Sequence, residues 1–216
     1  MTSADHIVFI VDDDAAIREA LGELLASHGT DSVGFESARA YIAAEKPARP
    51  ACLILDVELP DINGLDLQQQ IAGEDHPPIV FITGHGDIPS SVRAIKRGAV
   101  DFLTKPFSDA ELMTAVATAI GEDRRQRADR AELSGLRQRL DALTPRERQV
   151  LQLVVGGLLN KQAAAELGIS EATLEFHRRN VMQKMMAASF ADLVRIAGRL
   201  DIPIAKSRRI GEDRDG

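Results

Sequence analysis

The 216-residue chain is 44% hydrophobic but only 4% aromatic, with no tryptophan, so its core must be built mainly from aliphatic side chains. A single cysteine, Cys52, rules out an internal disulfide and suits a reducing cytoplasm, and no apolar run approaches the roughly 20 residues that span a bilayer. The net charge of −7 is uneven, because the acidic excess lies in residues 1–121 whereas residues 142–216 are net basic, which favours two modules with different partners.

Residues 1–121 alternate short apolar runs with amphipathic stretches. The apolar runs predict strands at residues 7–11, 32–35, 52–55, 79–82 and 101–103. The stretches between them predict helices at residues 15–27, 37–44, 64–72 and 90–97, with a fifth helix after the capping pair Ser108 and Glu111. This alternation predicts an α/β domain with a parallel sheet and right-handed crossovers.

After residue 121 the apolar density falls, and residues 122–130 are mostly charged and lack Gly and Pro. Leucines then recur at a spacing of three, four and three residues, which is typical of a short coiled-coil seam: Leu133, Leu136, Leu140 and Leu143. We therefore predict a helical linker over residues 122–141.

From Leu143 onward the pattern is helical, without a strand signal. Capping residues and glycines divide it into four helices, with starts at Thr144, Asn160, Ser170 and Ser189 and stops at Gly156-Gly157 and Gly168. The sequence predicts an all-α four-helix domain at residues 142–204 and a polar tail at residues 205–216.

Several carboxylates follow the predicted strands of the first half. Asp12, Asp13 and Asp14 come directly after the first strand, and Asp56 ends the third. The carboxyl ends of parallel strands meet at one edge of the sheet, so these side chains should lie together. They would repel one another without a cation, and hard oxygen ligands suit Mg²⁺.

A hydroxyl and an ammonium group complete the inventory at that edge, since Thr83 ends the fourth strand and Lys105 the fifth. A metal site, a carboxylate nucleophile and a cation together fit phosphoryl transfer to an aspartate. Any one of these residues could simply cap a helix, but that is a poor explanation for all of them at matching strand ends.

Residues 5–121 resemble the receiver domains of response regulators. The resemblance rests on Val11-Asp12-Asp13-Asp14, Leu55-Asp56, Pro60-Asp61 with Asn63-Gly64, Ile82-Thr83-Gly84 and Lys105-Pro106-Phe107. It implies a flavodoxin-like (βα)5 fold with sheet order 2-1-3-4-5, and Asp56 as the phosphoacceptor. The run Thr83-Gly84-His85-Gly86-Asp87 is most similar to the FixJ and StyR branch, and we expect His85 to be structural or at the surface.

The resemblance also implies a ligand set for Mg²⁺. Asp13 would bind the ion directly, Asp12 largely through water, and Glu58 through its backbone carbonyl. Asp56 belongs to the same ligand set.

Further roles follow from the same resemblance. Thr83 and Lys105 would contact the phosphoryl oxygens, and the ring of Phe102 would turn inward as Thr83 is drawn to the phosphate. The Lys105–Pro106 peptide bond would be cis.

A phosphatase of the haloacid dehalogenase type also uses an aspartate nucleophile and Mg²⁺. That class has its nucleophile at the end of the first strand and a second acid two residues later. Here Asp56 ends the third strand, and Glu58 precedes a Pro-Asp turn. We therefore expect a regulator and not an enzyme.

Two helices of the second half have helix-turn-helix spacing. On the second of them, Glu175, Phe176 and Arg179 share one face and could enter a major groove. There Arg179 could read guanine, Phe176 could touch a thymine methyl, and Glu175 could accept from cytosine N4. On spacing alone, a helical protein-interaction domain with a solvated basic face stays open.

Residues 143–198 resemble the LuxR-type DNA-binding domain of the NarL/FixJ family. The motifs include Leu143-Thr144-Pro145-Arg146-Glu147-Arg148, Gly157-Leu158, Leu167-Gly168-Ile169-Ser170 and His177-Arg178. The resemblance implies a dimer contact through the fourth helix, residues 189–198, and a DNA-contacting set of Asn160, Lys161, Ser170, Thr173, Glu175, Phe176, Arg178 and Arg179. The family commonly has a basic residue in place of Glu175, so we expect weaker non-specific phosphate attraction and an altered choice of site.

These features predict a phosphorylation-dependent transcription regulator of a two-component system, acting as an activator in the cytoplasm. Its expected partners are a sensor histidine kinase, double-stranded promoter DNA and RNA polymerase, with no membrane. We expect a homodimer when the protein is phosphorylated, paired through an apolar patch flanked by opposite charges: Val92, Ile95, Lys96 and Asp101. The alternative is a receiver that acts only through protein contacts, and salt-dependent binding to duplex DNA would separate the two.

Overall fold

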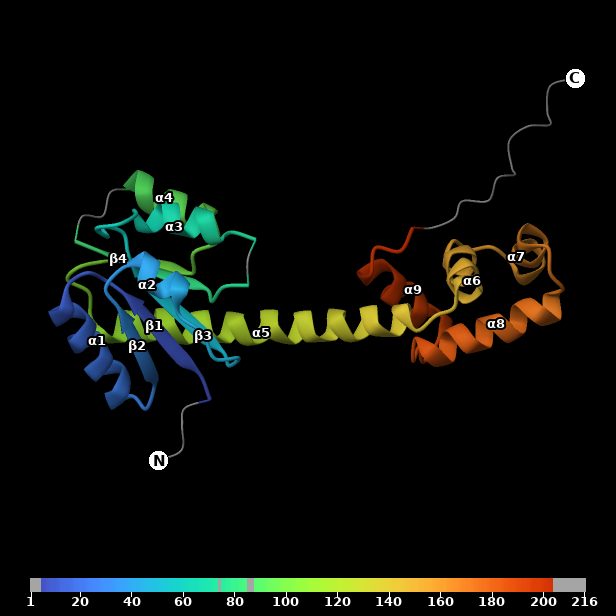
Figure 1. The fold of residues 1–216 in the computed structure, drawn as a ribbon, viewed down its shortest axis with the longest axis horizontal. Helices are drawn as coiled ribbons and strands as arrows, with labels where there is room; N and C mark the ends of the chain where they lie inside the picture. The colour runs from blue at the N-terminus through green and yellow to red at the C-terminus, as the bar shows by residue number, and fades with distance from the viewer. Residues whose placement is uncertain (1–4, 74, 85–87, 204–216) are drawn as a thin grey trace, which may run out of the picture. The chain divides into compact units, whose positions relative to one another are not determined.

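The computed structural model describes residues 5–73, 75–84 and 88–203 (Figure 1). The chain forms two compact units, which divide between Ala128 and Asp129. His85, its two following neighbours in the branch motif, and the expected polar tail at residues 205–216 lie outside the described residues. Within the described part of the chain, no helix combines the length and the apolar character needed to cross a membrane.

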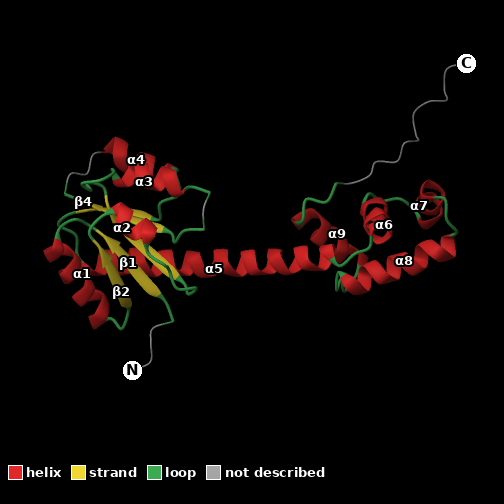
Figure 2. Cartoon of the chain, in the orientation of Figure 1, coloured by secondary structure: helices red, strands yellow, loops and turns green. Residues whose placement is uncertain are grey.

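The first unit contains a five-stranded parallel sheet with the order β2-β1-β3-β4-β5, as expected from the resemblance (Figure 2). Its strands are β1 (Ile7–Val11), β2 (Asp31–Phe35), β3 (Ala51–Asp56), β4 (Ile79–Thr83) and β5 (Asp101–Thr104). Every residue of β1, β3 and β4 is buried, which explains their continuous apolar sequences. Its helices are α1 (Ala15–Ser27), α2 (Ala38–Ala43), α3 (Gly64–Ile71), α4 (Ile88–Lys96) and the first part of α5 (Asp109–Asp141).

Alternate side chains of the buried strands feed two apolar layers. Leu53 and Leu55 pack with α2, α3 and α4 on one face of the sheet, whereas Cys52 and Ile54 pack with α1 and α5 on the other. Cys52 is a buried free thiol, as predicted. The two layers leave the carboxyl edge of the sheet as the polar end of the unit.

Local capping sets the helix bounds close to those predicted. The Asp14 carboxylate caps α1 by accepting from the Ala16 N–H, and Ser108 and Glu111 form the expected capping pair before α5. Helix α4 begins at Ile88, earlier than the predicted residue 90, because Pro89 fits the first turn of a helix.

Helix α5 is longer than the predicted fifth helix, because it continues without a break from Asp109 to Asp141. The first unit extends past residue 121 to Ala128, and the buried Asp123 attaches this part of α5 to the sheet. Its carboxylate accepts from the backbone N–H of Ala51 (2.8 Å) and from Nε of Arg127 (2.6 Å). This carboxylate therefore ties α5 to the start of β3.

The second unit contains the end of α5 followed by α6 (Pro145–Val155), α7 (Asn160–Leu167), α8 (Glu171–Lys184) and α9 (Phe190–Arg199). The predicted caps are confirmed: Thr144 caps α6, Ser170 caps α8 and Ser189 caps α9. Gly168 ends α7 with a φ of 65°, in the left-handed region that favours glycine.

The prediction that the leucines at the end of α5 form a coiled-coil-like seam is wrong, because they pack within the helical domain instead. Leu136 and Leu143 are buried in the core of the second unit, and Leu140 packs against that core. The last turns of α5 therefore belong to the hydrophobic core of the helical domain, because its own helices supply the surface that the leucines bury.

An ion pair between a buried carboxylate and a partly exposed ammonium group joins the start of α6 to the end of α8. Nζ of Lys184 lies 2.7 Å from Oε2 of Glu147, whose side chain is only 4% exposed, and the same carboxylate accepts from the Thr144 N–H (2.8 Å). Burial works against ionisation of Glu147, but the hydrogen bonds from Lys184 and Thr144 outweigh it and lower its pKa from 4.5 to about 2.

We predict that Glu147→Gln lowers the free energy of unfolding of the second unit by about 2 kcal/mol at pH 7, because it leaves the Lys184 ammonium without its anionic partner. A carboxyl group with a depressed folded pKa stabilises the fold above its ordinary pKa, and that contribution is lost as the pH falls from 4.5 toward 2. The difference between variant and wild type should therefore shrink over that interval. Urea denaturation at several pH values measures the free energy of unfolding of both proteins.

Glu166→Gln is the matched control, because Glu166 lies exposed on α7. It should change the stability by no more than about 0.5 kcal/mol. Equal stability of Glu147→Gln and Glu166→Gln at pH 7 would contradict a stabilising role for the ion pair between Glu147 and Lys184.

Candidate functional site

An ammonium group bridges two buried carboxylates at the carboxyl edge of the sheet. Asp12 follows β1 and is fully buried, and Asp56 ends β3 and is 6% exposed. Lys105, after β5, places its Nζ 2.8 Å from Oδ2 of Asp12 and 2.9 Å from Oδ2 of Asp56. The structure therefore brings together three residues that the sequence analysis placed at three different strand ends.

The remaining oxygens of this pair are held by the backbone. Oδ1 of Asp56 accepts from the N–H of Glu58 (3.1 Å), and Oδ1 of Asp12 accepts from the N–H of Asp14 (2.9 Å). Asp14 itself is the helix cap described above and is not part of the cluster. Both buried carboxylates are thus fixed in orientation before any ligand binds.

Burial and charge act against each other at this cluster. Desolvation raises the pKa of Asp56, and the hydrogen bond from Lys105 only partly offsets this effect. For Lys105 the balance is reversed: desolvation favours the neutral amine, but hydrogen bonds to Asp12 and Asp56 raise its pKa above the ordinary value. Lys105 therefore stays charged, whereas a further cation beside Asp56 would stabilise its ionised form.

The donor set fits a divalent cation. Asp12, Asp13 and Asp56 each offer a carboxylate oxygen, and these oxygens all lie within 4.8 Å of one another. Asp13 is exposed, at the mouth of the cluster. Three carboxylates against one ammonium leave a net negative charge, and all-oxygen donors with room for water suit Mg²⁺. Glu58, the expected carbonyl ligand, lies in the loop that follows Asp56.

Thr83 and Phe102 lie on the neighbouring strands. Thr83 ends β4, is fully buried, and accepts the backbone N–H of Lys105 at its carbonyl oxygen (2.7 Å). Phe102 is half-buried on β5, with its ring centroid 5.9 Å from that of Phe81. The Lys105–Pro106 bond is cis, as the resemblance implies.

The expected dimer residues lie around one groove between α4 and β5. This groove, of about 420 Å³, is lined by Val92, Ile95, Lys96, Asp101, Ser91 and Phe102. Val92 is 45% exposed and Ile95 47% exposed, so their apolar surface is open to solvent within the first unit. Phe102 therefore packs against Phe81 in the sheet and also lines the α4–β5 groove.

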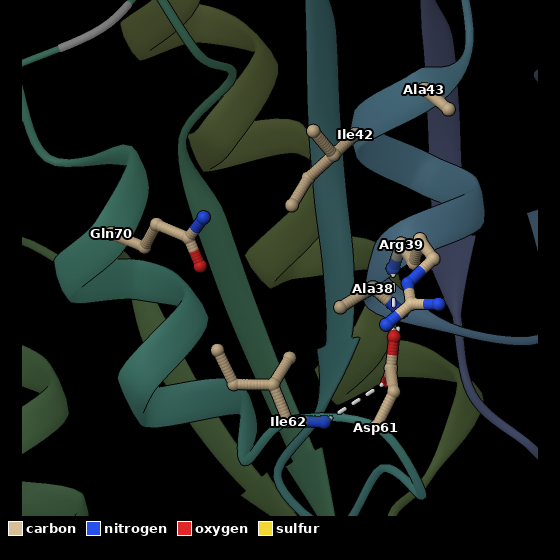
Figure 3. A pocket seen from close by; sticks show the side chains of 7 residues that line it. All are labelled: Ala38, Arg39, Ile42, Ala43, Asp61, Ile62 and Gln70. Atoms are coloured by element: carbon tan, nitrogen blue, oxygen red, sulfur yellow. Dashed lines mark hydrogen bonds between the residues drawn. The ribbon is translucent and has the colours of Figure 1, made fainter.

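The sequence analysis missed two long-range contacts, one at Asp12 and one in the loop that follows Asp56. Arg18 donates from Nη1 to the backbone carbonyl of Asp12 (2.7 Å), and the Asp61 carboxylate accepts from the first N–H groups of α2 (Figure 3). Asp61 appeared in the sequence only as part of the Pro60-Asp61 motif. Neither contact follows a spacing rule, because each depends on how separate elements pack.

In the second unit, α8 presents the expected face. Glu175, Phe176 and Arg179 are all exposed, with Phe176 at 57%. At the start of the helix, Ser170 and Thr173 are also exposed, and their hydroxyl groups lie 2.8 Å apart. The face therefore offers a carboxylate, an aromatic ring and a guanidinium to solvent together.

Arg178 is engaged differently from its neighbour. Its Nη1 donates to Oδ1 of Asn160 at the start of α7 (2.8 Å), and its guanidinium lies over the Phe190 ring at the start of α9 (5.0 Å). Two residues of the expected DNA-contacting set, Arg178 and Asn160, thus contact each other and tie three helices together. Lys161, next to them, is exposed.

Comparison with known families matches both units. Residues 8–117 match the response regulator receiver domain, and residues 141–197 match the luxR family of bacterial regulatory proteins.

Relatives align with nearly the whole chain. Nodulation protein W of Bradyrhizobium diazoefficiens is 48% identical over 201 residues, covering 93% of this chain and 88% of that protein. Response regulator protein TmoT of Ectopseudomonas mendocina is 46% identical over 202 residues, covering 93% and 91%.

Solved structures agree. The response regulator StyR, known from a low-resolution structure, is 43% identical with a TM-score of 0.78, covering 91% of this chain and 100% of that chain. Full-length FixJ from B. japonicum is 40% identical with a TM-score of 0.55, covering 93% and 98%.

Proposed function

The chain belongs to the NarL/FixJ family of response regulators, in which a receiver domain is joined to a LuxR-type helix-turn-helix domain, and we propose that it carries its signal as a phosphoryl group on Asp56. As a member of this FixJ- and StyR-like group, it is a phosphorylation-dependent transcription regulator of a two-component system. The family consists of regulators rather than typical enzymes, and we propose that this chain likewise is not an enzyme.

One observation carries the assignment of Asp56: the Lys105 ammonium contacts both Asp12 and Asp56 at the edge of a buried sheet. An Asp56 oxygen would attack the phosphorus, forming an acyl phosphate while the bond from phosphorus to the nitrogen of a kinase phosphohistidine breaks. Lys105 would follow the developing charge on the phosphoryl oxygens, and the Thr83 hydroxyl would donate to one of them.

Mg²⁺, held by Asp12, Asp13, Asp56 and the Glu58 carbonyl, would neutralise charge on the transferring phosphoryl group. The cluster of three carboxylates around one ammonium supports this ligand set.

We predict that incubation with acetyl phosphate and Mg²⁺ adds one phosphoryl group to the protein, and that Asp56→Asn abolishes the addition. The Asn side chain keeps the shape of Asp56 but lacks a nucleophilic oxygen of comparable strength. Intact-protein mass spectrometry measures the added mass. Asp66→Asn, an exposed change in the first turn of α3, should leave the addition unchanged. A phosphorylated Asp56→Asn protein would remove Asp56 from this role.

Thr83 and Phe102 would transmit the change at Asp56 to the surface of the receiver domain. Movement of Thr83 toward the phosphate would free space for the Phe102 ring, and the α4–β5 groove that Phe102 lines would change shape. Exposed Val92 and Ile95 line this groove together with Lys96 and Asp101. This supports pairing of two copies across a two-fold axis, since a cation and an anion on the same face can then meet their opposites.

We predict that phosphorylation converts the protein from monomer to dimer and that Val92→Asp prevents the conversion, because a carboxylate would be buried in the apolar part of the interface. Sedimentation velocity of the phosphorylated and unphosphorylated proteins measures the oligomeric state. Val33→Asp is the control, since Val33 is 42% exposed on β2, away from this groove. Phosphorylation that raises DNA affinity without dimerisation would refute the dimer switch.

Contact with duplex promoter DNA would be made by α8 in the major groove, with base readout by Glu175, Phe176 and Arg179 and additional contacts from Lys161, Ser170 and Thr173. The exposure of all three readout side chains supports this assignment. Arg178 and Asn160 would act as one paired unit at the edge of the interface, because each already satisfies the other.

We predict that Arg179→Ala weakens binding to the preferred DNA site by about 1–3 kcal/mol, roughly 5- to 150-fold, through loss of a bidentate base contact. Fluorescence anisotropy at fixed salt measures the affinity. Arg125→Ala removes an exposed arginine from α5 in the first unit and should leave the affinity within about twofold. Equal losses in both variants would point to general charge attraction and not to readout by α8.

We also propose that the chain acts in the cytoplasm as an activator, with a sensor histidine kinase as phosphodonor and RNA polymerase as the partner at the promoter. The solvent-open position of Asp13 at the mouth of the acidic cluster supports approach of a macromolecular donor.

A further inference from the structure

The loop between β3 and α3 is tied to the start of α2 by the Asp61 side chain. The carboxylate accepts from the backbone N–H groups of Ala38 (3.3 Å) and Arg39 (2.8 Å), the first two residues of α2. It also accepts from the N–H of Ile62 in its own loop (3.1 Å). Figure 3 shows Asp61 facing the first turn of α2, with dashed lines to these groups. We call this set of contacts the Asp61 clamp.

The clamp shares the capping of α2 with Ser37. The first N–H groups of a helix have no partner within it, and Ser37 satisfies only the third, by accepting from Ala40 (3.2 Å). Asp61 satisfies the first two from a distant part of the sequence. Burial opposes its ionisation, but the N–H groups of Arg39, Ala38 and Ile62 outweigh this and lower the pKa of Asp61, so the clamp is charged at neutral pH.

The same loop lies directly against the phosphoacceptor. At its start, the N–H of Glu58 binds Oδ1 of Asp56. At its end, the N–H of Gly64 binds the Val57 carbonyl (2.9 Å), and a Cβ on Gly64 would overlap the backbone carbonyl of Asp56. The start of the loop is therefore bonded to the last residue of β3 and its end to the residue that follows, whereas the clamp fixes its middle to a different element.

From this placement we propose that Asp61 is a positioning residue for phosphoryl transfer, which holds the Glu58 carbonyl in one orientation by tying its loop to α2. The inference rests on the proposed function, since it requires that the carboxylate cluster and the Glu58 carbonyl bind Mg²⁺. A carbonyl on an untethered loop would have to be ordered as the ion binds, and that ordering costs free energy. The clamp removes this cost in advance, much as residues that orient metal ligands do elsewhere.

A rival explanation is that Asp61 only stabilises α2. The two explanations differ for Ser37→Ala, which weakens the cap of α2 without touching the loop that carries Glu58. If Asp61 acts through the loop, removal of Asp61 should weaken metal binding and removal of the Ser37 hydroxyl should not.

The test is titration of the unphosphorylated full-length protein with Mg²⁺ alone, followed by amide NMR shifts. Asp61→Ala should raise the Kd for Mg²⁺ about tenfold, and Asp61→Asn, which keeps one acceptor oxygen, about threefold. Ser37→Ala should stay within about twofold of wild type. Amide hydrogen exchange at Ala38 and Arg39 in the metal-free protein should accelerate in Asp61→Ala, which reports loss of the clamp independently of any activity.

Asp13→Ala removes a proposed direct ligand and gives the loss of Mg²⁺ affinity expected when the metal site itself is damaged. This variant separates failure of the metal site from failure of the positioning role of Asp61. Unchanged Mg²⁺ binding in Asp13→Ala would overturn the metal site and with it the proposed chemistry. Weakened binding in Asp13→Ala, together with a Kd within twofold of wild type in Asp61→Ala, would overturn the positioning role alone. An equal loss in Ser37→Ala would also overturn it. If Asp61→Ala does not fold, Asp61→Asn decides by the same twofold criterion.

Discussion

Two carboxylates with almost no exposed surface, Asp12 just after β1 and Asp56 at the end of β3, lie at the same edge of two adjacent strands and repel each other. An unpaired buried charge costs several kcal/mol, so this edge of the sheet is stable only with a cation between them. Lys105 supplies that cation from the turn after β5, within hydrogen-bonding distance of both. The requirement fixes the path of that turn and confines polar groups to one end of strands that are otherwise wholly apolar.

The same arrangement explains why the edge can respond to phosphorylation. Lys105 compensates two carboxylates only partly, and Asp13 adds a third negative charge beside them. Under the proposed function, a phosphoryl group on Asp56 moves negative charge outward from the carboxylate, and the ammonium and the Thr83 hydroxyl follow it. Converting a 1:99 population to 99:1 takes about 5.5 kcal/mol, which is of the order that re-pairing a buried charge can supply. Phe102 lines the α4–β5 groove, and under the proposed function its ring would carry a displacement at this edge to that exposed surface.

Much of the fold could be predicted because its signals are local. Strands buried on both faces need continuous apolar runs, and helix ends need capping residues, so β1, α1 and the α6 cap were found from the sequence. Long-range pairings could not be predicted: Asp61 caps a helix that precedes it by more than twenty residues, and Arg18 fixes the Asp12 carbonyl from the next helix. The leucines at the end of α5 show the same limit, because a 3-4-3 spacing identifies an apolar face but not the partner that covers it.

Three consecutive aspartates show how the backbone, more than residue type, assigns a role at this site. Asp12 is the first residue beyond β1 and is still enclosed by the sheet, so it is buried and needs Lys105. Asp13, one residue further along, is exposed, yet its carboxylate oxygen lies within 4.8 Å of those of Asp12 and Asp56, so it can bind a cation that enters from solvent. Asp14 has an extended backbone just before α1, and its side chain turns back to cap that helix. The adjacent Arg178 and Arg179 differ in the same way, since a rotation of about 100° on α8 turns one toward Asn160 and Phe190 and the other to solvent. A functional set is therefore defined by the direction that the strand end or helix face gives to each side chain, and a motif locates it only once those elements are known.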